Sequence, residues 1–177
     1  MHFDDLDDLF LAAAREQHSR VGALVQALPG TGPFEGRLAA FVEQRSRVLE
    51  AIAPVARAAA LQEPFSPAIA ATTTMVRRLG RAELEHVFAA ELAVHAAPGR
   101  EQVLDACDAL TSADAWHHLR VRRELPVTDA AASMTTALRL LLRPAGPAVT
   151  TSDEPRVRRW RARASAAPAD TGGQEHR

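Results

Sequence analysis

The chain has 177 residues, a length that suits one domain or one domain with a tail. Its 21 basic residues are all arginines and are balanced by 22 acidic residues, so a net charge of -1 excludes a global attraction to nucleic acid or to an anionic membrane. A single cysteine excludes an internal disulfide. The sequence contains no run of about 18 apolar residues, so no membrane span is predicted. We expect a cytoplasmic protein, because the N-terminus is acidic and unlike a signal peptide.

The composition predicts an all-helical protein, since alanine and arginine favour helices and tyrosine is absent. The first helix is expected from about Leu6 to Leu28, with Asp5 as its cap, and the segment 29–33 (PGTGP) should stop it. Its apolar stripe follows a 3.6-residue period. The stripe consists of Leu6, Phe10, Ala13, Gln17, Val21, Leu24 and Leu28.

A second helix is expected from about Phe34 to Pro54. Proline removes an amide donor and clashes with the preceding turn, so Pro54 should end or kink this helix. A short alanine-rich helix is predicted over 55–61. The stripe of the second helix consists of Leu38, Phe41, Val42, Arg45, Leu49 and Ile52.

The segment 63–67 (EPFSP) predicts a break and a new helix. Ser66 is a suitable N-cap, and Pro67 fits the first helical position. We expect this helix to continue to about Val94, with Gly80 as a weak point.

Two further helices are predicted before the composition changes. One should run from about Arg100 to Arg123, and the last from a Thr128 cap to Leu142. Residues 144–177 are rich in Pro, Ala, Gly, Ser and Arg, and this segment is predicted to be a disordered tail. Together these elements predict a bundle of about six helices.

The N-terminus and the order of the helices resemble the TetR/AcrR (tetracycline-repressor) family. His2-Phe3 is similar to the aromatic pair that ends the recognition helix of that family, Asp4-Asp5 to the turn, and Leu6 to the start of the connecting helix. The resemblance covers roughly residues 2–142. It includes the segments 45–54, 64–67 and 104–112 with Trp116 following.

The resemblance implies a TetR-like C-terminal helical bundle and a division of the chain into three parts. Residues 1–5 would be the remnant of a helix-turn-helix, 6–143 the ligand-binding and dimerisation domain, and 144–177 the tail. The implied function is the sensor part of a transcriptional regulator, with operator DNA reached only through an N-terminal module missing from this chain. The alternative is a sensor-only interaction protein that pairs with a full-length relative.

One departure from the family concerns DNA. TetR-like proteins commonly have a lysine where this chain has Leu6, and the segment 4–8 carries four aspartates. Carboxylates repel a phosphate backbone, whose affinity for proteins comes largely from basic contacts. We therefore expect no sequence-specific DNA binding by the isolated chain.

No enzyme signature is recognisable, so neither catalytic residues nor a cofactor is predicted. The adjacent pair His117-His118 does not favour a metal site, because neighbouring side chains on a helix point about 100° apart. Asp114 does have a suitable spacing to both histidines, yet a pocket or surface role is favoured for them.

Two polar residues, Gln17 and Arg45, interrupt apolar stripes and must find a partner or face a cavity. The resemblance implies a mostly apolar pocket among the central helices for a small apolar or amphipathic effector. Plain core packing remains open as an alternative for each candidate. The candidate ligand-binding residues are Gln17, Phe41, Arg45, Phe65, Met75, Phe88, Trp116 and His117.

The last two predicted helices carry apolar side chains on more than one side, and in TetR-like proteins this pair forms a four-helix bundle with its copy. A homodimer is therefore expected. The candidate interface residues are Val103, Leu110, Met134, Leu138, Leu141 and Leu142.

Overall fold

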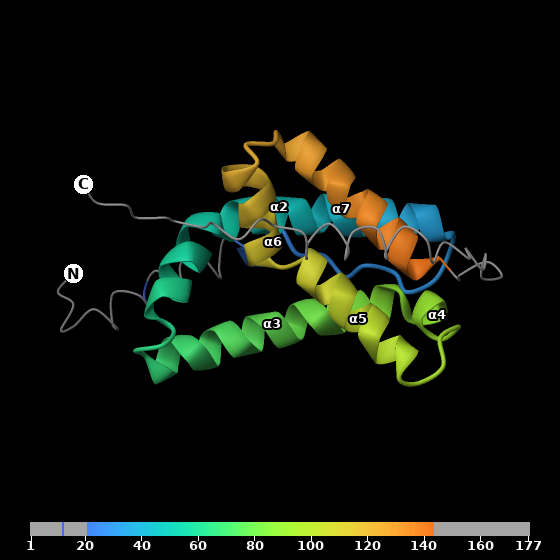
Figure 1. Ribbon diagram of the computed structural model, residues 1–177, viewed down its shortest axis with the longest axis horizontal. Coiled ribbons are helices and arrows are strands. Elements are labelled where there is room, and N and C mark those ends of the chain that lie inside the picture. Colours follow the sequence, from blue (N-terminus) through green and yellow to red (C-terminus); the bar gives the residue numbers. More distant parts are fainter. Residues whose placement is uncertain (1–11, 13–20, 144–177) are drawn as a thin grey trace, which may run out of the picture. The chain divides into compact units, whose positions relative to one another are not determined.

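A computed structural model describes residues 12 and 21–143 of the chain, and within these residues the prediction of an all-helical protein is confirmed. This part contains six α-helices and one π-helical turn and no strand (Figure 1). The predicted remnant 1–5, most of the first predicted helix and the predicted tail lie outside the described residues. The elements are α2 (Phe34–Gln62), α3 (Pro67–Val87), α4 (Ala89–Leu92), α5 (Gly99–Leu110), α6 (Ala113–His117), η1 (His118–Arg122) and α7 (Val127–Leu142).

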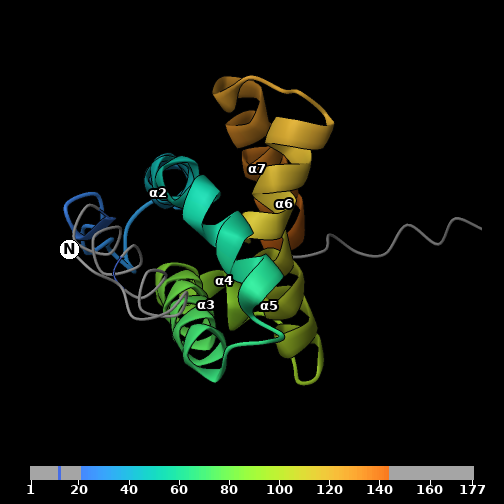
Figure 2. The same cartoon turned by 90° about the vertical axis from the view of Figure 1, so that its left-hand side faces the viewer.

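Helix α2 is central to the packing. It contacts α7, α3 and α6, while α5 packs against both α3 and α7 (Figures 1 and 2). The core is apolar, and its aromatic centre is the edge-to-face pair Phe41 and Phe88, whose ring centroids are 5.3 Å apart. Trp116 and Met134 close this core from α6 and α7.

The first predicted helix does not reach Leu28, so its predicted end is wrong. Val21 and Gly22 are helical, a turn follows, and residues 25–29 are not helical. The backbone N–H and C=O of Gln26 instead bond to the side chain of Gln44 on α2. A tertiary contact therefore replaces the helical hydrogen bonds that the apolar period of the sequence predicted.

Helix α2 does not end at Pro54 but continues to Gln62, and the predicted separate helix over 55–61 is its second half. Proline removes only one N–H donor, which would have bonded to the Glu50 carbonyl, and a long helix tolerates this loss by bending. Both views of the ribbon show that the second half of α2 turns toward α3 (Figures 1 and 2).

The predicted start of α3 is confirmed. The Ser66 side chain accepts a hydrogen bond from the Ile69 N–H at 3.4 Å, and Pro67 occupies the first helical position. The predicted end at Val94 is wrong, because Phe88 leaves the helical conformation with φ -112° and ψ 24° while its ring is fully buried. The short helix α4 follows. Gly80 does not interrupt α3.

The single helix predicted from Arg100 to Arg123 is divided at Thr111 and Ser112. The Thr111 hydroxyl donates to the Cys107 carbonyl at 2.9 Å, and the Ser112 hydroxyl accepts from the Ala115 N–H at 3.2 Å. These side chains compete for backbone groups of the helix, so one helix ends and another begins between them. Helix α6 then passes into the π-helical turn η1.

The last predicted helix is present and ends at Leu142 as expected, but Thr128 does not cap it. Pro126 occupies the N-cap position without a capping side chain. The Thr128 hydroxyl donates to the Asp129 carboxylate at 3.2 Å instead.

Candidate binding groove and buried polar network

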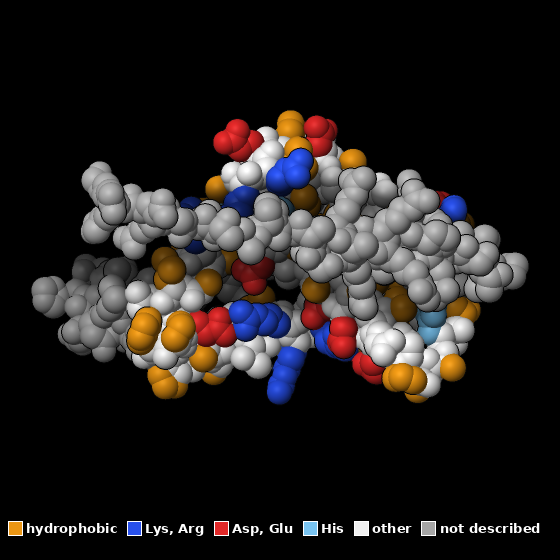
Figure 3. Space-filling model, viewed as in Figure 1, with side chains coloured by type: hydrophobic (Ala, Val, Ile, Leu, Met, Phe, Trp, Pro, Cys, Tyr) orange, Lys and Arg blue, Asp and Glu red, His pale blue; other side chains and the backbone are white. Residues whose placement is uncertain are grey.

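The structure does not gather the predicted ligand-binding residues around one enclosed cavity. Phe41, Phe88 and Trp116 are fully buried and form the core, which corresponds to the core-packing alternative. Phe65 and Met75 are wrong as walls of an enclosed pocket, since 81% and 55% of their surfaces are exposed. Figure 3 shows apolar side chains gathered at the end of the molecule where α2 meets α3.

The contrast between buried and exposed candidate residues has a simple cause in the packing of α3. The second half of the helix packs on the core through Leu84 and Val87, whereas the first half has one buried side chain, Ile69. His117 is half-buried at the end of α6, and Gln17 lies outside the described residues.

Arg45, the polar residue that interrupts the α2 stripe, points into the interior as expected but is paired there. Its guanidinium donates to the Glu83 carboxylate and to the Gly80 carbonyl, both at 2.9 Å. It also lies over the Phe41 ring at 4.9 Å from the centroid, a cation–π contact. Burial lowers the pKa of Arg45, and the negative charge of Glu83 opposes this shift.

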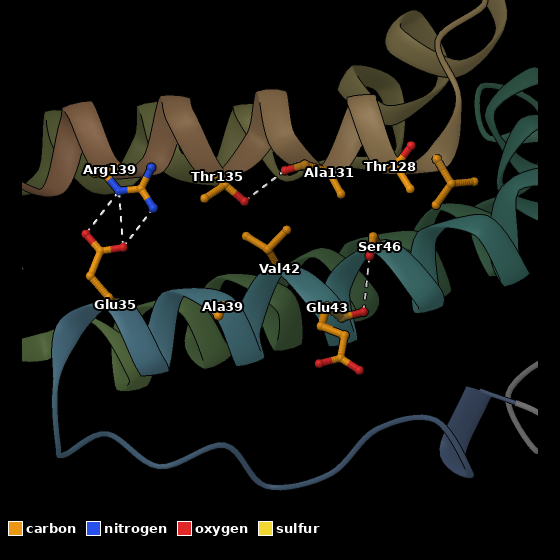
Figure 4. A pocket seen from close by; sticks show the side chains of 10 residues that line it. Glu35, Ala39, Val42, Glu43, Ser46, Thr128, Ala131, Thr135 and Arg139 are labelled. Atoms are coloured by element: carbon orange, nitrogen blue, oxygen red, sulfur yellow. Dashed lines mark hydrogen bonds and ion pairs between the residues drawn. The ribbon is translucent and has the colours of Figure 1, made fainter.

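An open groove lies between α2 and α7. Its volume is about 440 Å³, within the usual range for small-molecule sites, and it is open to solvent along its length. Figure 4 shows the two helices facing each other across it. The lining residues are Glu35, Ala39, Val42, Glu43 and Ser46 from α2 and Val127, Thr128, Ala131, Thr135 and Arg139 from α7.

The groove has an apolar floor and one charged end. Glu35 and Arg139 form a bidentate pair, with distances of 3.0 Å from Nε to Oε1 and 2.7 Å from Nη2 to Oε2. The hydrogen bond from Arg139 is the main reason why the pKa of Glu35 is lowered. The hydroxyls of Ser46 and Thr135 donate to carbonyls of their own helices, so they offer acceptor oxygens to the groove. A bound molecule would meet methyl groups, these oxygens and the ion pair.

A second hollow of about 410 Å³ shares Ser46 and Val127 with the groove and extends it along α2 to Ala51. The combined face of α2 thus runs from Glu35 to Ala51, which at 1.5 Å per residue is roughly 24 Å. This face carries no apolar periodicity that would predict a site, although small and polar residues recur on it every three or four positions. Only the apolar stripe on the neighbouring face of α2 was recognised.

Glu50, at the far end of this face, joins three elements. Its carboxylate accepts from the Trp116 indole N–H at 2.9 Å and from two nitrogens of Arg120 at 2.9 and 3.1 Å. The Arg120 guanidinium also donates to the Leu125 carbonyl at 2.5 Å. The hydrogen bond from Arg120 is the main cause that lowers the pKa of Glu50. This network ties α6 and η1 to α2.

The predicted dimer-interface residues are only partly available to a partner. Met134, Leu138 and Leu142 are buried in the core of the single chain and are therefore wrong as interface candidates. The helical period explains this, because the three residues share one side of α7 and that side faces α2 and α5. Val103, Leu110 and Leu141 stay partly exposed. Leu140, another apolar residue of the last predicted helix, is 73% exposed.

Within the described residues no group of three His, Cys, Asp or Glu side chains is arranged to hold a metal ion. Cys107 is buried, and burial raises the pKa of its thiol to about 11. None of the described helices has both the length and the apolar character that crossing a membrane requires.

Comparisons with protein-family models, with curated proteins and with solved structures found no match to this chain.

Proposed function

We propose that the chain is the effector-binding and dimer-forming part of a TetR-like transcriptional regulator. One observation carries this proposal, namely the outward side of α7. Ala132, Ser133, Thr136 and Leu140 are exposed there at helical spacing and are uncharged, and the charged residues of this side, Asp129 and Arg143, stand at its two ends. Solvated helices normally carry charged residues along their outer side, so the uncharged middle of this side favours a helix–helix interface. This is the side that a pair of copies would use.

The dimer is tested by placing a charge on this side of α7. Leu140→Glu is expected to convert a dimer of twice 19.1 kDa into a monomer in sizing experiments with light scattering. The matched control is Ala60→Glu, which adds the same charge at an exposed position of α2 and should leave the dimer intact. A monomeric unmodified chain at micromolar concentration would refute the proposed assembly.

The α2–α7 groove is our proposed site for a small apolar or amphipathic effector. It is supported by the methyl groups of Ala39, Val42 and Ala131 beside a few oriented oxygens. A ligand at 100 times its dissociation constant would stabilise the fold by about 2.7 kcal/mol. Ligands found by thermal shift should lose this effect in Ala131→Trp, which fills the groove, and keep it in Ala60→Trp. Retained stabilisation in Ala131→Trp would place the site elsewhere.

A second proposal is an interaction protein that pairs with a full-length relative. It is favoured by the exposed apolar side chains where α2 meets α3, which exceed what isolated surface residues explain. They are Leu61, Phe65, Met75, Val76 and Leu79. Co-expression with a full-length TetR-like regulator would distinguish the two functions. Mixed dimers that no longer bind operator DNA support the second, and exclusive homodimers contradict it.

A further inference from the structure

The segment between the turn at Leu24 and the start of α2 is held by side chains rather than by regular secondary structure. We call residues 25–33 the strap; Figure 4 shows it in blue along α2. Gln44 of α2 clamps it by accepting from the Gln26 N–H at 2.8 Å and donating to the Gln26 C=O at 3.1 Å. One side-chain amide thus satisfies both backbone groups of one strap residue, as a neighbouring β-strand would.

The other end of the strap is held by a second clamp. The Arg37 Nε donates to the Gly32 carbonyl at 3.1 Å, and the same guanidinium pairs with Glu91 at 2.5 Å. Between the clamps the strap lies close to α3, because a Cβ at Gly30 would come within 2.9 Å of the His86 carbonyl oxygen. Arg37 and Gln44 are themselves buried, so their polar groups depend on these partners.

The Gln44 clamp is connected to the interior through Glu83 of α3. The Gln44 Nε2 also donates to Glu83 Oε1 at 2.7 Å, while the other Glu83 oxygen accepts from Arg45 at 2.9 Å. An ionised carboxylate only accepts hydrogen bonds, so Glu83 can bond only the NH₂ side of the Gln44 amide. This choice turns the amide oxygen toward the Gln26 N–H.

We propose that Gln44 and Glu83 form a latch, in which Glu83 sets the orientation of the Gln44 amide and thereby holds the strap. Arg45 positions Glu83 from the interior, so a shift of Arg45 away from Glu83 loosens the strap at Gln26. The segment before α2 is in this way coupled to the contact between α2 and α3. The latch rests on these described contacts and is independent of the proposed effector and dimer.

Amide hydrogen exchange at Gln26, followed by NMR, tests the latch. In the unmodified chain this N–H, outside any helix, should exchange at least about tenfold more slowly than its intrinsic rate. Gln44→Ala should remove this protection, and so should Glu83→Ala, although Glu83 makes no hydrogen bond to the strap. The control Glu43→Ala changes an exposed neighbour on the same helix and should change nothing at Gln26.

The core amide of Leu104 reports whether each variant is folded. If the Leu104 amide also loses its protection in Glu83→Ala, the experiment is repeated with Glu83→Gln, since an amide can present either an oxygen or an NH₂ group to Gln44. Its expected result is a partial, roughly threefold loss of protection at Gln26. The latch is overturned if Gln26 exchanges at its intrinsic rate in the unmodified chain. It is also overturned if folded Glu83 variants protect Gln26 as well as the unmodified protein does.

Discussion

Replacing Gly80 with alanine is expected to destabilise the protein, although alanine is the better helix former. A Cβ at position 80 would lie 2.8 Å from Nη1 of Arg45, so the guanidinium must move. Its bonds to the Gly80 carbonyl and to Glu83 are both made by the neighbouring Nη2, and we expect the shift of Nη1 to break one of them. A hydrogen bond to a charged group contributes about 1.5–3 kcal/mol, whereas the gain in helix propensity is about 0.8–1.0 kcal/mol. The expected net loss in the free energy of unfolding is about 1 kcal/mol.

The same substitution should change sign once the guanidinium is removed. In an Arg45→Met background the guanidinium that a new Cβ would meet is gone, and Gly80→Ala should stabilise the protein by about 1 kcal/mol. Urea denaturation followed by circular dichroism measures all four variants of this cycle. Arg47→Met is the matched control, because Arg47 is an exposed arginine on the same helix and Gly80→Ala should stay destabilising beside it. If Gly80→Ala has the same effect in the unmodified protein and in the Arg45→Met background, the reasoning is refuted.

Three further outcomes follow from burial and charge. Leu138→Glu should cost at least about 3 kcal/mol of unfolding free energy, because Leu138 is buried. Leu140 is exposed, so Leu140→Glu should change the stability of the monomeric subunit by no more than about 0.5 kcal/mol, apart from the loss of any dimer. Equal losses in the chemical denaturation of the two chains as monomers would contradict this. With its pKa raised to about 11, the Cys107 thiol is about 0.1% ionised at pH 8. Thiol reagents should therefore modify Cys107 only after unfolding in urea. Fast labelling of the native protein would show that the thiol is accessible and contradict this. Arg120 lowers the pKa of Glu50 below 4.5, so the pair stabilises the fold above about pH 5 and this contribution is lost as the pH falls through the folded-state pKa. The Glu50→Gln variant should therefore lose less stability than the unmodified protein between about pH 5 and pH 3. If both proteins show the same dependence of stability on acid pH, the pair is excluded as a contributor.

Local signals in the sequence predicted several helix ends correctly. Ser66 with Pro67 starts α3 as expected, because a capping hydroxyl and a proline act through the backbone of their own turn. The prediction failed where a side chain from elsewhere satisfies the backbone. Gln44 bonds to Gln26, and the helix expected to reach Leu28 is replaced by the strap. Such a partner, 18 positions away, leaves no periodic signal in the sequence.

The candidate site was harder to predict than the fold, because hydrophobicity alone does not distinguish a core aromatic from an exposed one. Phe41 and Phe65 are the same residue type, one in a predicted helix and the other in the predicted break before α3, yet Phe41 is fully buried and Phe65 is 81% exposed. The difference arises from the bend of α2 and from the length of α3 beyond its packed half. Both are tertiary features, so a pocket assembled from aromatic residues in the sequence mixed two environments.

The polar residues of α2 show which of its sides depends on specific partners. Arg37, Gln44 and Arg45 are turned toward the strap and α3, and each is satisfied there by a carboxylate or a backbone carbonyl. Removing one partner from such a buried pair typically costs about 3–5 kcal/mol, since the other charge stays behind. The opposite side, along the groove with α7, is held by methyl contacts and by the solvent-exposed pair of Glu35 and Arg139, which contributes little. Substitutions are therefore tolerated on the groove side of α2, whereas the strap side constrains both the sequence and the register of the helix.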